Sequence, residues 1–234
     1  PSGSDTNPGT SAQPWATFKH AFKDANGMKG GDTLILKDGI YTQAIGEQGG
    51  SLYKSQYYSP PSGTAGAYTI IKAENDGKAI IQDAYIYIGG PATSIPCSGC
   101  SAISDGSSYI QIEGLKLLRS SIDIRHSDHI KVLRTGVKNG VPIDSDGHVV
   151  GTSELSHHIL FEDVWVIGTM RYGISAFESS NVIFRRVVVR FDGNIHPTAP
   201  KAGINLYGAT PWGTGCCGPG ILGAHDNICQ NCVM

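Results

Sequence analysis

The chain has 234 residues, of which 40% are hydrophobic and only 16% are charged, and this balance excludes an intrinsically disordered protein. Its 31 glycines and 12 prolines indicate many turns and few long helices. A formal net charge of −2 excludes a general attraction to nucleic acid, so no nucleic-acid partner is expected, and any site for a polyanion must be local. No apolar run approaches the roughly 20 residues that cross a bilayer, so we expect no membrane span.

One segment near the N-terminus, residues 14–27, has the periodicity of a helix. Its apolar residues recur on one helical face: Trp15, Phe18, Phe22 and Ala25. Pro14 suits the first turn and Gly27 supplies a stop signal. Residues 1–13 are expected to precede this helix as an extended segment, and from residue 31 onward turns alternate with short strands.

From residue 107 onward the chain repeats itself. Each copy has a small polar turn followed by apolar residues at offsets 0, 2, 5 and 7, and the copies start at Ile110, Ile130, Ile159 and Val182. A shorter strand precedes two of these starts, at residues 122–124 and 174–176. Two strands and a variable loop per repeat are typical of a solenoid whose coils pair in parallel. The alternative is an antiparallel sandwich, but hairpin turns are rare here and the repeats stay in phase.

The sequence therefore predicts an all-β protein, a right-handed parallel β-helix with a short N-terminal capping α-helix. We expect a single domain over residues 1–234, with the coils filling residues 31–234. Insertions interrupt the repeat at residues 138–148, 190–202 and 208–220. In a solenoid, equivalent linkers lie on the same side of every coil, so the first two insertions are expected to lie close together.

Five segments carry a family resemblance: residues 3–10 (GSDTNPGT), 13–17 (QPWAT), 31–41 (GDTLILKDGIY), 68–74 (YTIIKAE) and 79–81 (AII). They resemble the opening of secreted β-helix proteins of the pectate-lyase-like superfamily. The resemblance covers most of the chain and implies a helix that caps the first coil. It implies no single activity, because the superfamily includes lyases, hydrolases, epimerases and non-catalytic surface proteins.

The insertions and the linkers around them carry the candidate functional residues, because insertions on one face of a solenoid often form its binding face. The candidates for proton transfer are Lys201, Arg190 and His196. The candidates for binding substrate are Arg171 and Trp212, and His148 belongs to the same face. The candidate ligands of a cation, for which calcium is the expected ion, are Asp144, Asp146, Asp192 and Asn194. The alternative interpretation is that these Asp-rich and Asn-rich segments are turns.

The six cysteines fall into three close pairs: Cys97 with Cys100, Cys216 with Cys217, and Cys229 with Cys232. An even number of cysteines in an exported chain predicts disulfides, although two CxxC pairs also suit a zinc site or redox chemistry. We expect export from these cysteines and from the polar, glycine-rich and serine-rich composition. The polar segment after Pro1 is interpreted as a mature N-terminus.

Two further clusters have structural interpretations. Glu162 and Asp163 occupy the same offsets as Arg185 and Arg186 in the next coil, which predicts an ion-pair ladder about 4.8 Å apart. Four histidines fall at coil turns, where exposed or hydrogen-bonded side chains are a better prediction than a metal site: His126, His129, His157 and His158.

The function expected from these features is that of a secreted or cell-surface protein that binds or modifies an extracellular polysaccharide. As an enzyme it would be a polysaccharide lyase or a glycosidase. The alternative is a non-catalytic structural or adhesive protein that associates with itself, because Cys232, Val233 and Met234 end the sequence inside a coil.

Overall fold

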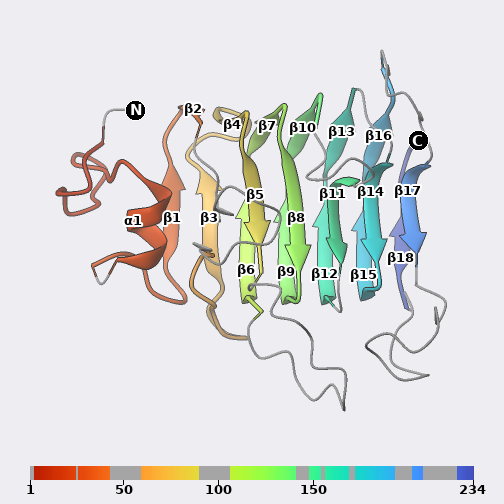
Figure 1. The fold of residues 1–234 in the computed structure, drawn as a ribbon, viewed down its shortest axis with the longest axis horizontal. Coiled ribbons are helices and arrows are strands. Elements are labelled where there is room, and N and C mark those ends of the chain that lie inside the picture. The colour runs from red at the N-terminus through yellow and green to blue at the C-terminus, as the bar shows by residue number, and fades with distance from the viewer. Residues whose placement is uncertain are drawn as a thin grey trace, which may run out of the picture.

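The computed structural model describes residues 3–24, 26–42, 59–89, 106–140, 148–153, 156–168, 172–192, 202–207 and 226–234. In these residues the strands form three sheets, and every pairing between them is parallel. The coils stack in one row from the N-terminal helix to the last strand (Figure 1). The predicted all-β fold, a parallel β-helix behind a short N-terminal helix, is confirmed.

From residue 85 to residue 190, each coil contributes one strand to each sheet, in the order sheet C, sheet A, sheet B. Sheet A contains β1 (Thr33–Leu36), β3 (Thr69–Ala73), β6 (Ser108–Glu113), β9 (Asp128–Leu133), β12 (His157–Glu162), β15 (Ser180–Arg185) and β18 (Ile228–Gln230). Sheet B contains β2 (Gly39–Tyr41), β4 (Ala79–Gln82), β7 (Lys116–Leu118), β10 (Gly136–Lys138), β13 (Trp165–Ile167) and β16 (Val188–Arg190). Sheet C contains β5 (Tyr85–Ile88), β8 (Ser121–Arg125), β11 (His148–Ser153), β14 (Tyr172–Phe177) and β17 (Ala202–Tyr207).

The core is a set of apolar columns along the axis of the solenoid. Strand side chains alternate between the two faces of a sheet, so every second residue of a coil points inward. Ile110, Ile130, Ile159 and Val182 are register partners in neighbouring coils and are at most 1% exposed. This register is the one that the repeat predicts, and it places the intervening residues on the outside of the sheets.

The corner between sheets A and B has the same backbone conformation in successive coils. From residue 114 onward, one residue there takes a positive φ between 45° and 70° in successive coils: Gly114, Arg134, Asp163, Arg186 and Asn231. Arg186 donates to Glu162 from Nη2 at 2.5 Å and to Asp163 from Nε at 2.6 Å. The predicted ion-pair ladder is therefore confirmed.

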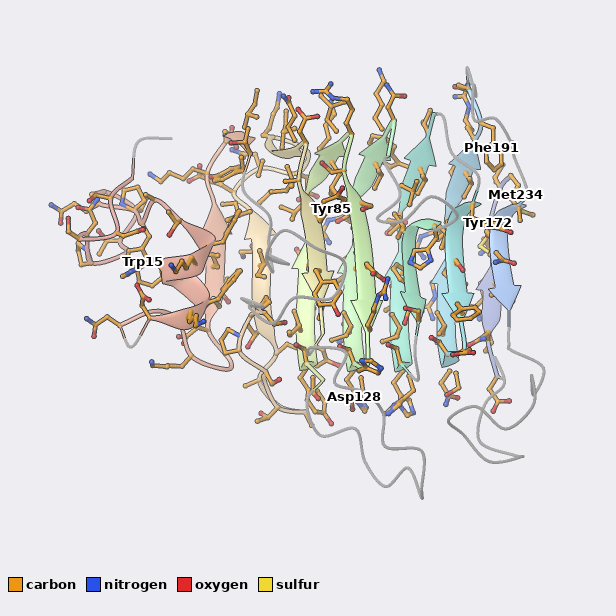
Figure 2. All side chains as sticks on the ribbon, viewed as in Figure 1. Trp15, Tyr85, Asp128, Tyr172, Phe191 and Met234 are labelled. Carbon is orange, nitrogen blue, oxygen red and sulfur yellow. A yellow bond between two sulfur atoms is a disulfide. The ribbon has the colours of Figure 1, made fainter. Side chains whose placement is uncertain are left out.

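Helix α1 (Phe18–Lys23) is shorter than the predicted segment 14–27, and it covers the first coil with Phe18, Ala21 and Phe22. The Thr17 hydroxyl accepts from the His20 backbone N–H at 3.1 Å and so starts the helix. Asp5 accepts from the Thr17 hydroxyl at 2.7 Å and from the Thr17 backbone N–H at 2.9 Å, and Thr17 itself is extended. Residues 3–13, predicted as extended, contain turns and pack beside Trp15 at the N-terminal end of the solenoid (Figure 2).

The last described coil leaves apolar side chains in contact with solvent. They are Leu206, Ile228, Val233 and Met234, and Met234 marks this end of the solenoid in Figure 2. Self-association through this end stays a prediction.

The described part of the chain contains no helix of the length and apolarity needed to cross a membrane.

Candidate functional site

Of the residues predicted for proton transfer and cation binding, Arg190 and Asp192 lie in the described part of the chain, and they bind each other. His148, which was predicted on the same face, is also described. Arg190 ends strand β16 of sheet B, and its Nη2 donates to Asp192 Oδ2 at 2.7 Å. The Arg190 side chain is 59% exposed and the Asp192 side chain is 50% exposed. The Asp192 carboxylate therefore already has a cationic partner, and Arg190 belongs to sheet B.

The remaining candidates for the site lie outside the described residues: Lys201, His196, Arg171, Trp212, Asp144, Asp146 and Asn194. Arg171 and Lys201 directly precede strands β14 and β17 of sheet C, whose first residues Tyr172 and Ala202 are register partners. Within the described ranges, no group of three or more His, Cys, Asp or Glu side chains is placed to hold a metal ion. Calcium binding stays a prediction.

Cys229 and Cys232 form a disulfide, as one of the interpretations of the CxxC pairs predicts. The other four cysteines lie outside the described residues: Cys97, Cys100, Cys216 and Cys217.

The outer face of sheet C carries a buried carboxylate that the sequence analysis did not select. Asp123 lies on β8 between Ile122 and Ile124, which point into the core. Alternation along the strand turns Asp123 outward, yet it is only 1% exposed. Carboxylates are almost never fully buried unless they are paired, so the partners of Asp123 identify the site.

Two basic side chains provide those partners. Arg125 Nε donates to Asp123 Oδ2 at 2.6 Å, and His148 Nε2 lies 3.3 Å from Asp123 Oδ1. Burial by itself would raise the pKa of the Asp123 carboxyl. The hydrogen bond from His148, the charges of His148 and Arg125, and the bond from Arg125 outweigh this and hold that pKa below its usual value. The carboxylate is ionised at neutral pH, and both of its oxygens are occupied by basic partners.

A glycine lets His148 reach Asp123. The register partner of Asp123 on the next strand is Gly151. A β-carbon at Gly151 would lie 2.6 Å from His148 Cδ2 and 2.7 Å from the Ser175 carbonyl oxygen. The imidazole therefore occupies the space that a side chain at position 151 would fill. It crosses the backbone of β11 to the carboxylate on β8.

Asp123 belongs to a polar row that crosses all five strands of sheet C. The row consists of Tyr87, Asp123, Gly151, Ser175 and Asn205, which are successive register partners. Tyr85 on β5 and Tyr172 on β14 lie on this side of the solenoid (Figure 2). Tyr87, Asp123 and Ser175 are at most 4% exposed, so the groups of this side that reach solvent include Arg125, His148 and Tyr85. A guanidinium group and an imidazole beside an aromatic ring suit a ligand that is rich in hydroxyl and carboxylate groups.

The chemistry available here centres on His148. When the ring is neutral, a carboxylate that accepts from Nε2 fixes the ring orientation and leaves Nδ1 as a proton acceptor. His148 and Arg125 have side chains that are 14% and 21% exposed, whereas that of Asp123 is 2% exposed. The two basic groups are therefore the reactive surface of the cluster, and Asp123 positions them.

A second cluster of rings lies at the corner between sheets C and A. Tyr109, His129 and His158 occupy equivalent positions in successive coils, each with a φ near 55°. The ring centroids of neighbours are 4.5 Å and 4.7 Å apart. Asp128 accepts from His129 Nδ1 at 2.7 Å near the start of β9 (Figure 2). The prediction that the turn histidines make hydrogen bonds is confirmed for His129, and the rings stack on one another.

No protein-family model matches the chain, and no curated protein sequence matches it. Among solved structures, the chain is similar to an alginate lyase from Paenibacillus sp. str. FPU-7, with a TM-score of 0.51 and 14% identity over 92% of this chain and 72% of that chain. The likeness is one of fold.

Two further structures align over shorter shares of their own lengths. One is a mannuronic acid specific polysaccharide family 6 lyase from human gut microbiota, with a TM-score of 0.36 and 14% identity over 88% of this chain and 53% of that chain. The other is ORF18 of Geobacillus virus E2, with a TM-score of 0.33 and 10% identity over 91% of this chain and 42% of that chain.

Proposed function

We propose that this protein is a secreted polysaccharide lyase that binds an acidic polysaccharide on the outer face of sheet C and cleaves it by β-elimination. The observation that carries the proposal is the buried Asp123 carboxylate, which holds Arg125 and His148 at the centre of a polar row. The β-helix fold, which the chain shares with an alginate lyase, agrees with this activity. The Cys229–Cys232 disulfide supports an oxidising compartment.

β-Elimination of a uronate needs positive charge at the sugar carboxylate, a base for the C5 proton and a proton donor for the leaving oxygen. Arg125 supplies the positive charge. His148, oriented through Nε2 by Asp123, accepts the C5 proton on Nδ1. The electrons of the C5–H bond form the C4–C5 double bond while the bond from C4 to the glycosidic oxygen breaks.

The leaving oxygen takes a proton from a neighbouring side chain. Tyr172 is the candidate in the described residues, because it is the register partner of His148 on the next strand. Lys201 and His196 remain candidates from the sequence. No step is assigned to calcium, because the carboxylates of Asp123 and Asp192 both have cationic partners.

The test is to incubate the protein with alginate, polygalacturonate and hyaluronan, with and without a calcium chelator. Cleavage is followed by the ultraviolet absorbance of the unsaturated product. His148→Ala should lower the rate on the cleaved polymer by about 100-fold or more, the usual contribution of a general base. His157→Ala, which changes a histidine at the corner between sheets C and A, is the control and should keep the wild-type rate.

Two results contradict the proposal. New reducing ends without a rise in ultraviolet absorbance would show that the protein hydrolyses the polymer and does not cleave it by elimination. Absence of any product, or wild-type activity in His148→Ala, would remove the assigned base.

A further inference from the structure

A tryptophan lies flat on the outer face of sheet B, away from the sheet C row. Trp165 opens strand β13, and its register partner on β10 is Gly136. A β-carbon at Gly136 would lie 1.9 Å from both Cε2 and Cζ2 of Trp165. The indole therefore covers the glycine backbone with one face and turns the opposite face outward. This arrangement depends on glycine, because any side chain at position 136 would displace the ring.

Two lysines flank this ring without anionic partners. Lys116 is the register partner of Gly136 on the other side, and Lys138 ends strand β10. Within the described part of the chain, neither lysine side chain makes a hydrogen bond or an ion pair. Among the described residues, Asp192 is the one carboxylate that lines the same depression, and Arg190 balances its charge at 2.7 Å. The surface around Trp165 is therefore positively charged.

The ring and the lysines line one shallow depression of about 510 Å³, together with Asn139, Ile167, Gly168 and Asp192. The Trp165 indole N–H and the Asn139 side-chain amide have no hydrogen-bond partner among the described residues. The depression thus combines an apolar ring face, unused hydrogen-bond donors and two positive charges. An acidic sugar matches all three, with its C–H face, its hydroxyls and its carboxylate.

We propose that sheet B carries a second saccharide-binding surface, in which Trp165 stacks on one ring of an acidic polysaccharide and Lys116 and Lys138 bind its carboxylates. The inference rests on the proposed function for the class of ligand, but it needs no cleavage. Because sheets B and C are separate faces of the solenoid, a chain held on sheet B leaves the Asp123 row open to another part of the polymer. Such a surface raises the effective concentration of polymer at the protein.

The test is isothermal titration of the full chain with saturated oligosaccharides of mannuronate and of galacturonate, and with neutral cello-oligosaccharides as the comparison ligand. All binding is measured in the His148→Ala background, so that no cleavage occurs. Trp165→Ala should weaken binding of the acidic oligosaccharide by about tenfold or more, as loss of a central aromatic contact does. Trp165→Phe keeps a ring and should bind more tightly than Trp165→Ala.

A second set of variants tests the role of the positive charge. The double variant Lys116→Gln, Lys138→Gln should weaken binding at low salt and flatten its dependence on salt concentration. Lys72→Gln, on strand β3 of sheet A, is the matched control and should bind as the parent does. Thermal unfolding of each variant shows whether a loss of binding reflects a loss of fold.

The proposal is overturned if Trp165→Ala and the double lysine variant bind acidic oligosaccharides as tightly as the parent. Equal affinity for neutral and acidic oligosaccharides would overturn the assigned charge preference. Cleavage by the wild-type protein is measured separately, so an inactive protein that still binds through Trp165 contradicts only the proposed lyase activity.

Discussion

Asp123 is the one carboxylate among the buried side chains of the described residues, and carboxylates ordinarily prefer water. A buried ion pair is costly to desolvate, and the loss of one member is costlier still because the other is left unpaired. Here the carboxylate serves two bases, Arg125 and His148, and one substitution disturbs both. The sequence alone marks Asp123 only weakly, as an ionisable residue between two isoleucines in a short strand.

We predict that Asp123→Asn lowers the stability of the fold by about 3–5 kcal/mol, the usual cost of breaking a buried pair. The pKa of the folded carboxyl lies below its unfolded value of about 3.9. Its contribution is therefore present above about pH 4 and is lost as the pH falls below that value toward the folded pKa. The measurement is the unfolding midpoint from about pH 3 to about pH 7, roughly the range that spans this loss. Toward acidic pH, the midpoint of the wild type should fall more steeply than that of Asp123→Asn.

Asp83→Asn is the control for this measurement, because Asp83 forms an exposed pair with Arg119 at 2.6 Å. Its unfolding midpoint should stay close to that of the wild type. A wild-type midpoint for Asp123→Asn at pH 7 would show that the buried cluster adds nothing to stability.

The sequence predicts the strands well and the site only in part, and the reason is physical. Inward positions repeat because every coil must fill the same cross-section, so Ile110 and its register partners are visible as a pattern. Outward positions obey no such constraint, and a contact such as His148 with Asp123 spans 25 residues. Recognising it requires knowing that position 151 pairs with position 123 and is a glycine.

Sheet A carries the two largest of the fully buried side chains in the described residues. Phe161 on β12 and Phe184 on β15 are register partners, both are 0% exposed, and their rings stack with centroids 5.3 Å apart. Neighbouring coils are thus joined by side-chain packing inside the solenoid as well as by the backbone hydrogen bonds of the sheet.

We expect Phe184→Ala to destabilise the protein by about 3–5 kcal/mol, because it removes a buried ring and leaves a cavity beside Phe161. Chemical denaturation followed by circular dichroism measures this loss. Ile183→Ala, one residue away on the outer side of the same strand, should cost clearly less. Similar losses at the two positions would mean that the alternation along β15 is wrong.

At the scale of the whole molecule, the solenoid is a one-dimensional stack in which each coil contacts only its neighbours. The first coil therefore depends on helix α1, whose start is set by Thr17 and Asp5. The helix was predicted from its apolar spacing, but its length was not. The hydrogen bond that helps to fix where the helix begins joins Thr17 to Asp5, which lies 12 positions earlier in the chain.

Thr17→Ala should cost about 1 kcal/mol through loss of the helix cap. Because contacts in a stack are local, hydrogen exchange should speed up in α1 and β1 and stay unchanged in β9 and β12. Thr42→Ala, which changes an exposed threonine, is the control. Uniform acceleration over all coils would show that the stack unfolds as one unit.

The corners between sheets A and B have a consequence for how such a molecule varies in length. Successive coils have a positive-φ residue at the same position of this corner. The two strands that flank the corner therefore superpose from one coil to the next. A duplicated coil, or an excised one, would rejoin the chain with its inward columns and its corners intact. The solenoid can therefore be lengthened or shortened by whole coils, and the length of its outer faces is set by the number of coils.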